Sequence, residues 1–231
     1  MQLRIRASAR FPLAGMDWPR KLLIGGATGL LLELVFVGLA YLASEEAAFG
    51  LSPFVVGLNF PALGYILQVY RGTLRWEAGA LPEWENWPAL MRSGLATFAV
   101  GLGYGVIPLL LVVTGFALLV KGGVLLFLGG VLIVLGVLAA VLVYFFLPMG
   151  LARYQAQSRI DVAFRPGILW GGINTVLVEY VAAYLLSLGS VLLAGLIAAI
   201  PYLGPLVWPF IWFYLMLVVA RLFGEICAKA A

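Results

Sequence analysis

The stretch from Leu95 to Leu147 constrains the fold most, because it contains a single charged residue, Lys121. An α-helix rises about 1.5 Å per residue, and the hydrocarbon core of a bilayer is about 30 Å thick. A run of this length is too long for one crossing and must turn back on itself. Lys121-Gly122-Gly123 supplies polar and flexible residues for a tight turn. The stretch therefore predicts two membrane-spanning helices joined by a short loop.

The composition extends this interpretation to the whole chain. Hydrophobic residues make up 64% of the sequence and charged residues 10%, whereas a soluble domain carries roughly a quarter charged residues. The absence of histidine excludes Ser-His and Cys-His nucleophile pairs and histidine metal sites. The single cysteine, Cys227, cannot form an internal disulfide. We predict a polytopic integral membrane protein without a metal or a cofactor.

The apolar runs predict an all-α protein with six membrane-spanning helices, arranged as three consecutive hairpins in one domain, residues 1–231. The predicted spans are residues 22–42, 53–70, 95–120, 123–147, 168–199 and 206–223. With a cytoplasmic N-terminus, every Lys and Arg except Lys121 lies in an inner segment, which is thirteen of the fourteen. The positive-inside rule therefore places both termini in the cytoplasm. We expect a multi-pass protein of the cytoplasmic membrane, and the clustered basic residues favour topology signals over nucleic-acid binding.

The longest polar interruption, residues 71–94, is named the elbow. We predict that it forms a cytoplasmic interfacial helix between the second and third spans, with indole rings at headgroup depth and charges in water. In the alternative, its glutamates face a soluble or membrane partner. The residues assigned to this interfacial site are Arg71, Arg75, Trp76, Glu83, Trp84 and Trp87.

Each predicted hairpin opens with the spacing Pro-x5-Gly, at Pro19 to Gly25, Pro88 to Gly94 and Pro166 to Gly172. A threefold repeat would fit the internal duplication that is common in transporter folds, although repeats also occur in proteins that move nothing. Coincidence is the rival explanation, because the chain contains 28 glycines.

Several short motifs together carry a resemblance to a known family. They are Asp17-Trp18-Pro19, Gly64-Tyr65, Arg71, the run LPEWENW at residues 81–87, Gly94, residues 154–164 and Arg221-Leu222-Phe223-Gly224. With these motifs the chain resembles a family of prokaryotic membrane proteins catalogued as domain of unknown function 4013. Cys227 departs from the aromatic residue expected there. The resemblance implies the membrane architecture and transfers no catalytic residues.

Two glutamates lie inside predicted spans. Glu33 follows Leu22 by eleven residues and Glu179 follows Ile168 by eleven, which would place both carboxyls about 16 Å from the cytoplasmic edge. Small residues surround each glutamate in helical spacing, so we expect both to point into the helix bundle. We predict a midplane polar cluster, which consists of Glu33, Glu179, Asn174, Tyr180 and Asn59.

Three classes of function remain open. A non-catalytic scaffold or accessory subunit is favoured because the chain shows no assembled catalytic group and little soluble surface. A small permease or channel would use Glu33 and Glu179 for an ion or a small solute, since an ionisable residue in a span is a functional candidate. An intramembrane enzyme is the third option. The partners implied are the bilayer and either other membrane proteins or further copies of this chain.

Overall fold

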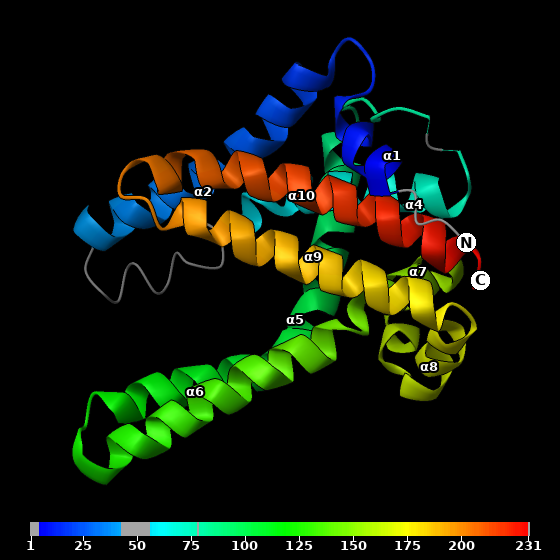
Figure 1. Ribbon diagram of the computed structural model, residues 1–231. Coiled ribbons are helices and arrows are strands. Elements are labelled where there is room, and N and C mark those ends of the chain that lie inside the picture. The colour runs from blue at the N-terminus through cyan, green and yellow to red at the C-terminus, as the bar shows by residue number, and fades with distance from the viewer. Residues whose placement is uncertain (1–4, 43–55, 78, 231) are drawn as a thin grey trace. The chain divides into compact units, whose positions relative to one another are not determined.

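The structure, a computed structural model, describes residues 5–42, 56–77 and 79–230, without the side chains of residues 40–42 (Figure 1). Within these residues every regular element is a helix, which confirms the predicted all-α class. In this described part of the chain, five helices are long and apolar enough to cross a membrane. They are α2 (Trp18–Leu42), α5 (Trp87–Leu119), α6 (Gly123–Tyr144), α9 (Leu177–Ala198) and α10 (Leu203–Ala228).

The second predicted span, residues 53–70, lies partly outside the described residues. Residues 60–70 of its described part belong to α4 (Phe60–Leu74), which has Pro61 in its first turn, where a missing backbone N–H costs nothing. The segment between the first two predicted spans, residues 43–52, lies outside the described residues as well.

Helix ends differ from the predicted spans where polar residues continue a helix beyond the apolar run. The helix α5 begins at Trp87 and not at residue 95, and α10 continues to Ala228 and not to residue 223. In contrast, the predicted span 168–199 is divided between α8 (Pro166–Thr175) and α9, because Val176 has φ −128° and ψ 25°, outside the helical region. Apolar runs mark the part of a helix that suits lipid, and not the whole helix.

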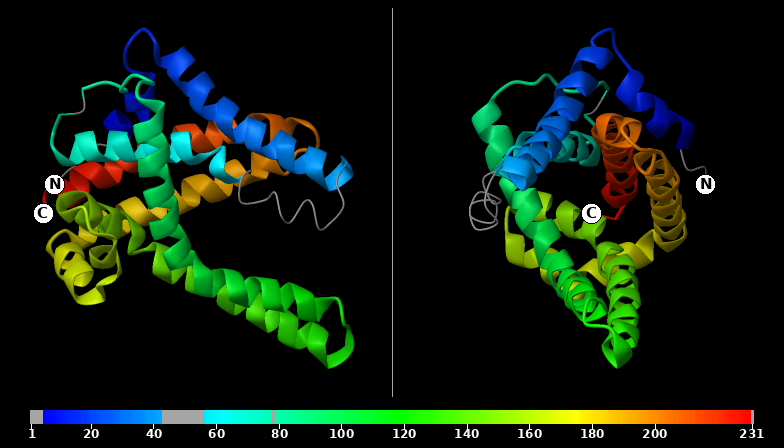
Figure 2. Two further views of the ribbon diagram at one scale, coloured as in Figure 1. Left: turned by 180° about the vertical axis from the view of Figure 1, so that it is seen from behind. Right: turned by 90° about the vertical axis from the view of Figure 1, so that its left-hand side faces the viewer.

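The chain forms two compact units, residues 1–97 with 172–231 and residues 98–171. In the first unit α10 is the central helix, and it packs against α2, α4 and α9. Figures 1 and 2 show α9 and α10 lying side by side along their length. They form an antiparallel hairpin, since Tyr180 contacts Phe223 at one end and Gly204 meets Ala198 at the other.

The helix α2 crosses α10 in the antiparallel direction through a face of small residues. Gly25 and Gly26 of α2 lie against the rings of Phe213 and Phe210, and a methyl group on either glycine would overlap these rings. One turn further, a Cβ atom on Gly29 would lie 3.0 Å from Cβ of Pro209. Small residues allow the close approach of two helices that have little else to hold them together in lipid.

The helix α4 also depends on glycines, at its crossings with α5 and α10. A methyl group on Gly64 would overlap the carbonyl oxygen of Leu90, and one on Gly94 would overlap the carbonyl oxygen of Phe60. A Cβ atom on Gly224 of α10 would lie 2.6 Å from Cβ of Thr73. Both helices at each crossing are therefore held at backbone contact distance.

The N-terminal segment lies on α10. It consists of α1 (Ile5–Arg10) and the 3-10 helix η1 (Phe11–Leu13). The hydroxyl of Tyr214 donates a hydrogen bond of 2.7 Å to the carbonyl oxygen of Ala9. The guanidinium of Arg221 lies 4.9 Å from the ring centroid of Phe11, a cation–π contact.

The second unit contains the predicted hairpin of two spans. The turn between α5 and α6 lies at Gly122 and Gly123, whose φ angles are +70° and +60°, in the region that glycine adopts without steric cost. The two helices are in close contact near Gly115 and Gly129, since a Cβ atom on Gly129 would lie 2.6 Å from the carbonyl oxygen of Gly115. The predicted reversal at residues 121–123 is confirmed.

The remaining part of the second unit contains α7 (Leu147–Gln157), the 3-10 helix η2 (Ile160–Phe164) and the first part of α8. The hydroxyl of Tyr104 donates a hydrogen bond to the carbonyl oxygen of Ala163. Asp161 accepts hydrogen bonds from Arg159, at 3.0 and 2.9 Å, and from Arg165, at 2.8 Å. These bonds and the positive charges, those of Arg159 foremost, hold the pKa of Asp161 below its ordinary value.

Candidate functional site

The elbow does not contain the predicted interfacial helix, and that prediction is wrong. The helix α4 ends at Leu74 and α5 begins at Trp87, and the described residues between them, 75–77 and 79–86, form no helix. Trp76 and Asn86 have φ angles of +60° and +52°, in the left-handed region that interrupts a helix. Pro82 also lacks the N–H that a helix would require.

Trp84 joins three helices of the first unit. Its indole stacks on Tyr65 of α4, with ring centroids 4.2 Å apart and an interplanar angle of 10°. Phe213 of α10 lies 6.0 Å from the same ring. The indole Nε1 donates a hydrogen bond of 3.1 Å to the carbonyl oxygen of Lys21 on α2. Trp84 is thus packed among α2, α4 and α10, and it does not lie on a surface helix.

Lys21 of α2 also binds the loop that contains Trp84. Its ammonium donates a hydrogen bond of 2.9 Å to the carbonyl oxygen of Leu81 and forms an ion pair of 2.5 Å with Glu83. The residue is only 8% exposed, and a buried ammonium requires such partners. The hydroxyl of Tyr65 adds a hydrogen bond of 2.7 Å to the carbonyl oxygen of Pro82. We call Lys21, Tyr65 and residues 81–84 the clasp.

The other residues assigned to the elbow site do not take part in the clasp. Trp76 is 65% exposed and Trp87 is 43% exposed, while Arg71 and Arg75 are exposed at the end of α4. Trp87 does contact Trp84, at a centroid distance of 5.5 Å. The predicted site therefore separates into Glu83 and Trp84, which take part in the clasp, and four residues that do not.

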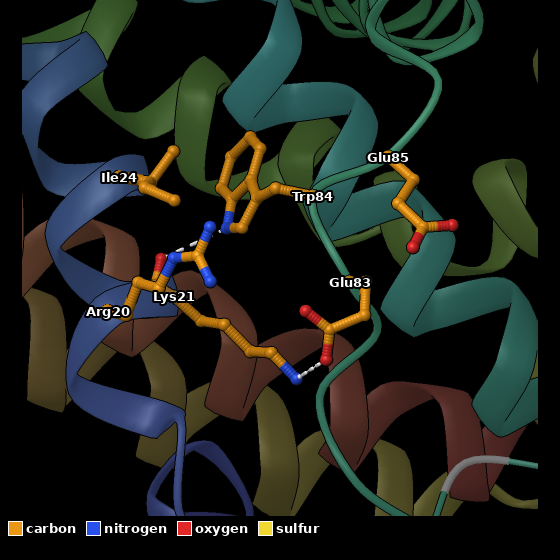
Figure 3. A pocket seen from close by; sticks show the side chains of 6 residues that line it. All are labelled: Arg20, Lys21, Ile24, Glu83, Trp84 and Glu85. Atoms are coloured by element: carbon orange, nitrogen blue, oxygen red, sulfur yellow. Dashed lines mark hydrogen bonds and ion pairs between the residues drawn. The ribbon is translucent and has the colours of Figure 1, made fainter.

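A pocket of about 200 Å³ lies beside the clasp (Figure 3). Its lining residues are Arg20, Lys21, Ile24, Glu83, Trp84 and Glu85. Figure 3 shows that the two cationic side chains come from α2 and the two acidic ones from the loop that follows Pro82. The pocket thus combines two positive and two negative groups at the first turns of an apolar helix.

Glu179 is held by Lys229, a cation that lies beyond the last predicted span. The ammonium of Lys229 donates hydrogen bonds of 3.0 and 2.7 Å to the two carboxylate oxygens. The Glu179 side chain is 5% exposed, whereas that of Lys229 is 46% exposed. This ion pair joins the start of α9 to the end of α10.

The structure does not bring Glu33 and Glu179 together, and the common depth expected for them is corrected. Glu179 lies in the first turn of α9 because the helix is interrupted at Val176, so its carboxylate is near an end of that span and not at its middle. Glu33 lies one turn beyond Gly29, which faces Pro209 near the start of α10. The two glutamates are therefore associated with opposite ends of α10.

The other members of the predicted cluster are also dispersed. Tyr180 is fully buried with its ring edge-on to Phe223, and Asn174 is exposed on α8. Asn59 precedes α4, and its side chain does not cap the helix. One carboxylate oxygen of Glu33 and the Oδ1 atom of Asn59 are buried without a hydrogen-bond partner in the described part of the chain. Among the same residues, no group of three or more Asp, Glu and Cys side chains could hold a metal ion.

Sequence reasoning missed the residues that complete these contacts, which are Arg20, Lys21, Tyr65, Phe213 and Lys229. A signal existed for Lys229 alone. The predicted hairpin of spans 168–199 and 206–223 places residues near 179 and 229 opposite each other, once the second helix continues past residue 223. No pattern in the sequence pairs Lys21 with Glu83 across the long connection between them.

These observations define a class, a helical membrane protein in whose described part the ion pairs Lys21–Glu83 and Glu179–Lys229 each join one segment to another. The family model described as "Protein of unknown function (DUF4013)" matches residues 47–203, which is more than half of the chain. The chain therefore belongs to this family, as its motifs had indicated. Comparisons with curated proteins and with solved structures gave no match.

Proposed function

We propose that this protein is a non-catalytic scaffold or accessory subunit of a membrane complex. The observation that carries the proposal is that two ion pairs of the first unit connect its own segments. Glu179 binds Lys229, and Lys21 binds Glu83 and the loop backbone. Each pair fastens one segment of the unit to another, and neither leaves a free charge along a path between helices. A transport path would require such groups to face water or a substrate.

A small permease is the second candidate, and Glu33 is the observation that favours it. Its carboxylate lies within the apolar span Trp18–Leu39, and one of its oxygens has no partner among the described residues. Burying a charged group in a span costs at least about 2.5 kcal/mol on an insertion scale, so such residues are often retained for function. Catalysis at the same carboxyl is the third and weakest proposal, since it would need a second polar group beside Glu33.

Flux and complex size together test the scaffold proposal. Liposomes that contain the wild-type protein are expected to show no protein-dependent flux of H⁺, Na⁺ or K⁺ under an imposed gradient. In mild detergent, protein from native membranes is expected to migrate well above its own mass of 24.9 kDa, with a second subunit in fixed ratio. A flux that is lost in Glu33→Gln, while folding is retained, would replace the scaffold by the permease.

We further propose six spans with both termini in the cytoplasm of a cytoplasmic membrane. The alternating directions in the first unit support this, because α2 and α9 run opposite to α10. Reporters that act outside the membrane are expected to be active when fused near Ala47 or Gly122, and cytoplasmic reporters near Ala80 and Ser158. An outside signal from the fusion at Ala80 would contradict the topology.

A further inference from the structure

The pocket beside the clasp contains two charged groups that the fold does not use. Lys21 and Glu83 are already paired with each other. Arg20 and Glu85 also line the pocket, and within the described residues neither side chain has an ion pair or hydrogen bond of its own. Both residues therefore line the same pocket, Arg20 from α2 and Glu85 from the loop, and both remain unpaired within the described residues.

The balance of charge restricts the ligand. Arg20 and Lys21 offset Glu83 and Glu85, so the lining is neutral overall. A ligand of one sign would meet two like charges in the pocket, whose repulsion opposes binding. A small zwitterion avoids this cost, because its anionic group can face the guanidinium while its cationic group faces the carboxylates. Arg binds phosphate oxygens well, since its planar guanidinium can donate two parallel hydrogen bonds.

The location of the pocket points to a lipid as the source of that zwitterion. It lies at the first turns of α2, directly after Trp18, where the apolar span Trp18–Leu39 begins. Trp, Arg and Lys at the start of a span lie at the depth of lipid headgroups. This argument holds for either leaflet, so it does not depend on the orientation of the chain.

An apolar stripe continues from the pocket along α2. Arg20, Ile24, Ala27, Leu31 and Leu34 follow helical spacing of three or four residues, which places them on one face. Ile24 lines the pocket, Ala27 is exposed, and Leu31 and Leu34 are 50% and 60% exposed. An acyl chain could lie along this face while its headgroup occupies the pocket.

The volume agrees with a headgroup and not with a whole ligand. Pockets that enclose drug-sized ligands measure about 300 to 1,000 Å³, whereas this one measures about 200 Å³. It can enclose a compact polar group and must leave the remaining part of a larger molecule outside.

We propose that the pocket binds the headgroup of phosphatidylethanolamine, a phospholipid with a phosphate and a primary ammonium. Arg20 binds the phosphate, Glu83 and Glu85 accept hydrogen bonds from the ammonium, and the acyl chains lie along the stripe of α2. Phosphatidylcholine fits less well because its trimethylated ammonium has no N–H to donate. Phosphatidylglycerol lacks a cation and brings its negative charge close to Glu83 and Glu85.

Native mass spectrometry of the whole chain tests the proposal. The delipidated protein in detergent is mixed with phosphatidylethanolamine, phosphatidylcholine or phosphatidylglycerol of identical acyl chains, and bound lipid is counted. We expect about tenfold tighter binding of phosphatidylethanolamine, which corresponds to about 1.4 kcal/mol. Arg20→Gln and Glu85→Gln are each expected to abolish most of this preference. Neither residue takes part in the clasp, so thermal unfolding should be unchanged.

Matched controls use charges outside the pocket. Arg92→Gln and Glu77→Gln remove an exposed cation and an exposed anion of the same unit, and they should leave lipid binding as in the wild type. Equal binding of the three lipids, or an equal loss in these controls, would overturn the proposal. Soluble phosphoethanolamine at the lipid concentration should displace little lipid, because it has no acyl chains. Full displacement would assign the pocket to a free zwitterion and overturn the lipid as its source.

Discussion

Gly94→Ala is expected to destabilise the first unit by about 3 kcal/mol, at the upper end of the cost of overpacking a tight contact. The added methyl group would overlap the backbone carbonyl of Phe60. A backbone atom cannot rotate away as a flexible side chain can, so α4 and α5 would have to separate. Thermal unfolding in a fixed detergent, followed by tryptophan fluorescence, measures the effect.

Gly101→Ala is the matched control, because it makes the same change in the same helix. Apart from the backbone of its own helix turn and its two chain neighbours, no described heavy atom lies within 4 Å of a Cβ atom built on Gly101. Alanine should be neutral there or stabilise the helix by up to about 1 kcal/mol. Equal midpoints for Gly94→Ala and the wild type would show that α4 and α5 do not meet at backbone contact distance.

The all-α class and the reversal at residues 121–123 could be predicted because each rests on one strong local property. An apolar run of this length has no stable place except a bilayer, and two consecutive glycines after Lys121 suit a tight turn. The ends of α5 and α10 could not be predicted in the same way. The apolar run describes the lipid-facing part, whereas the helix continues for as long as its backbone bonds are satisfied.

The elbow shows why an amphipathic composition did not predict its structure. Trp76, Trp84 and Trp87 suit a surface helix by residue type. The backbone conformations of Trp76 and Asn86 interrupt the helix instead. Trp84 does not lie on a surface helix, because its ring stacks on Tyr65 and its Nε1 donates a hydrogen bond to α2. These partners are distant in sequence, so no local pattern reveals them.

The depth of Glu179 was misjudged for a related reason. Counting from Ile168 assumes one continuous helix, and the interruption at Val176 moves the glutamate to the first turn of α9. Glu179 there meets Lys229, which follows the last residue of α10 and is its neighbour across the hairpin. The ion pair of Glu179 and Lys229 at a span end therefore joins two helices. Two carboxyls at the midplane would instead have favoured a role in transport.

Lys229→Met is expected to destabilise the protein by about 3 kcal/mol, because removing one partner of a buried ion pair leaves the other charge uncompensated. Glu179 is 4% exposed, so its carboxylate would lose both hydrogen bonds with little access to water. We place the loss at the lower end of the usual range because the Lys229 side chain is 46% exposed. Lys121→Met, which changes an exposed lysine in a turn, serves as the control and should be nearly neutral.

Substitution of Glu179, the other partner, should destabilise the protein less than substitution of Lys229. The difference between the two losses is a sharper test of the ion pair than either loss alone. In Glu179→Gln the buried group is neutral, and the half-exposed ammonium of Lys229 can turn to water, so a loss of about 1 kcal/mol is expected. The double variant Glu179→Gln with Lys229→Met should recover most of the stability lost in Lys229→Met, since no unpaired charge remains. Unfolding midpoints of the four proteins in one detergent complete the cycle. Additive losses would mean that the two side chains act independently and that the pair does not fasten α9 to α10.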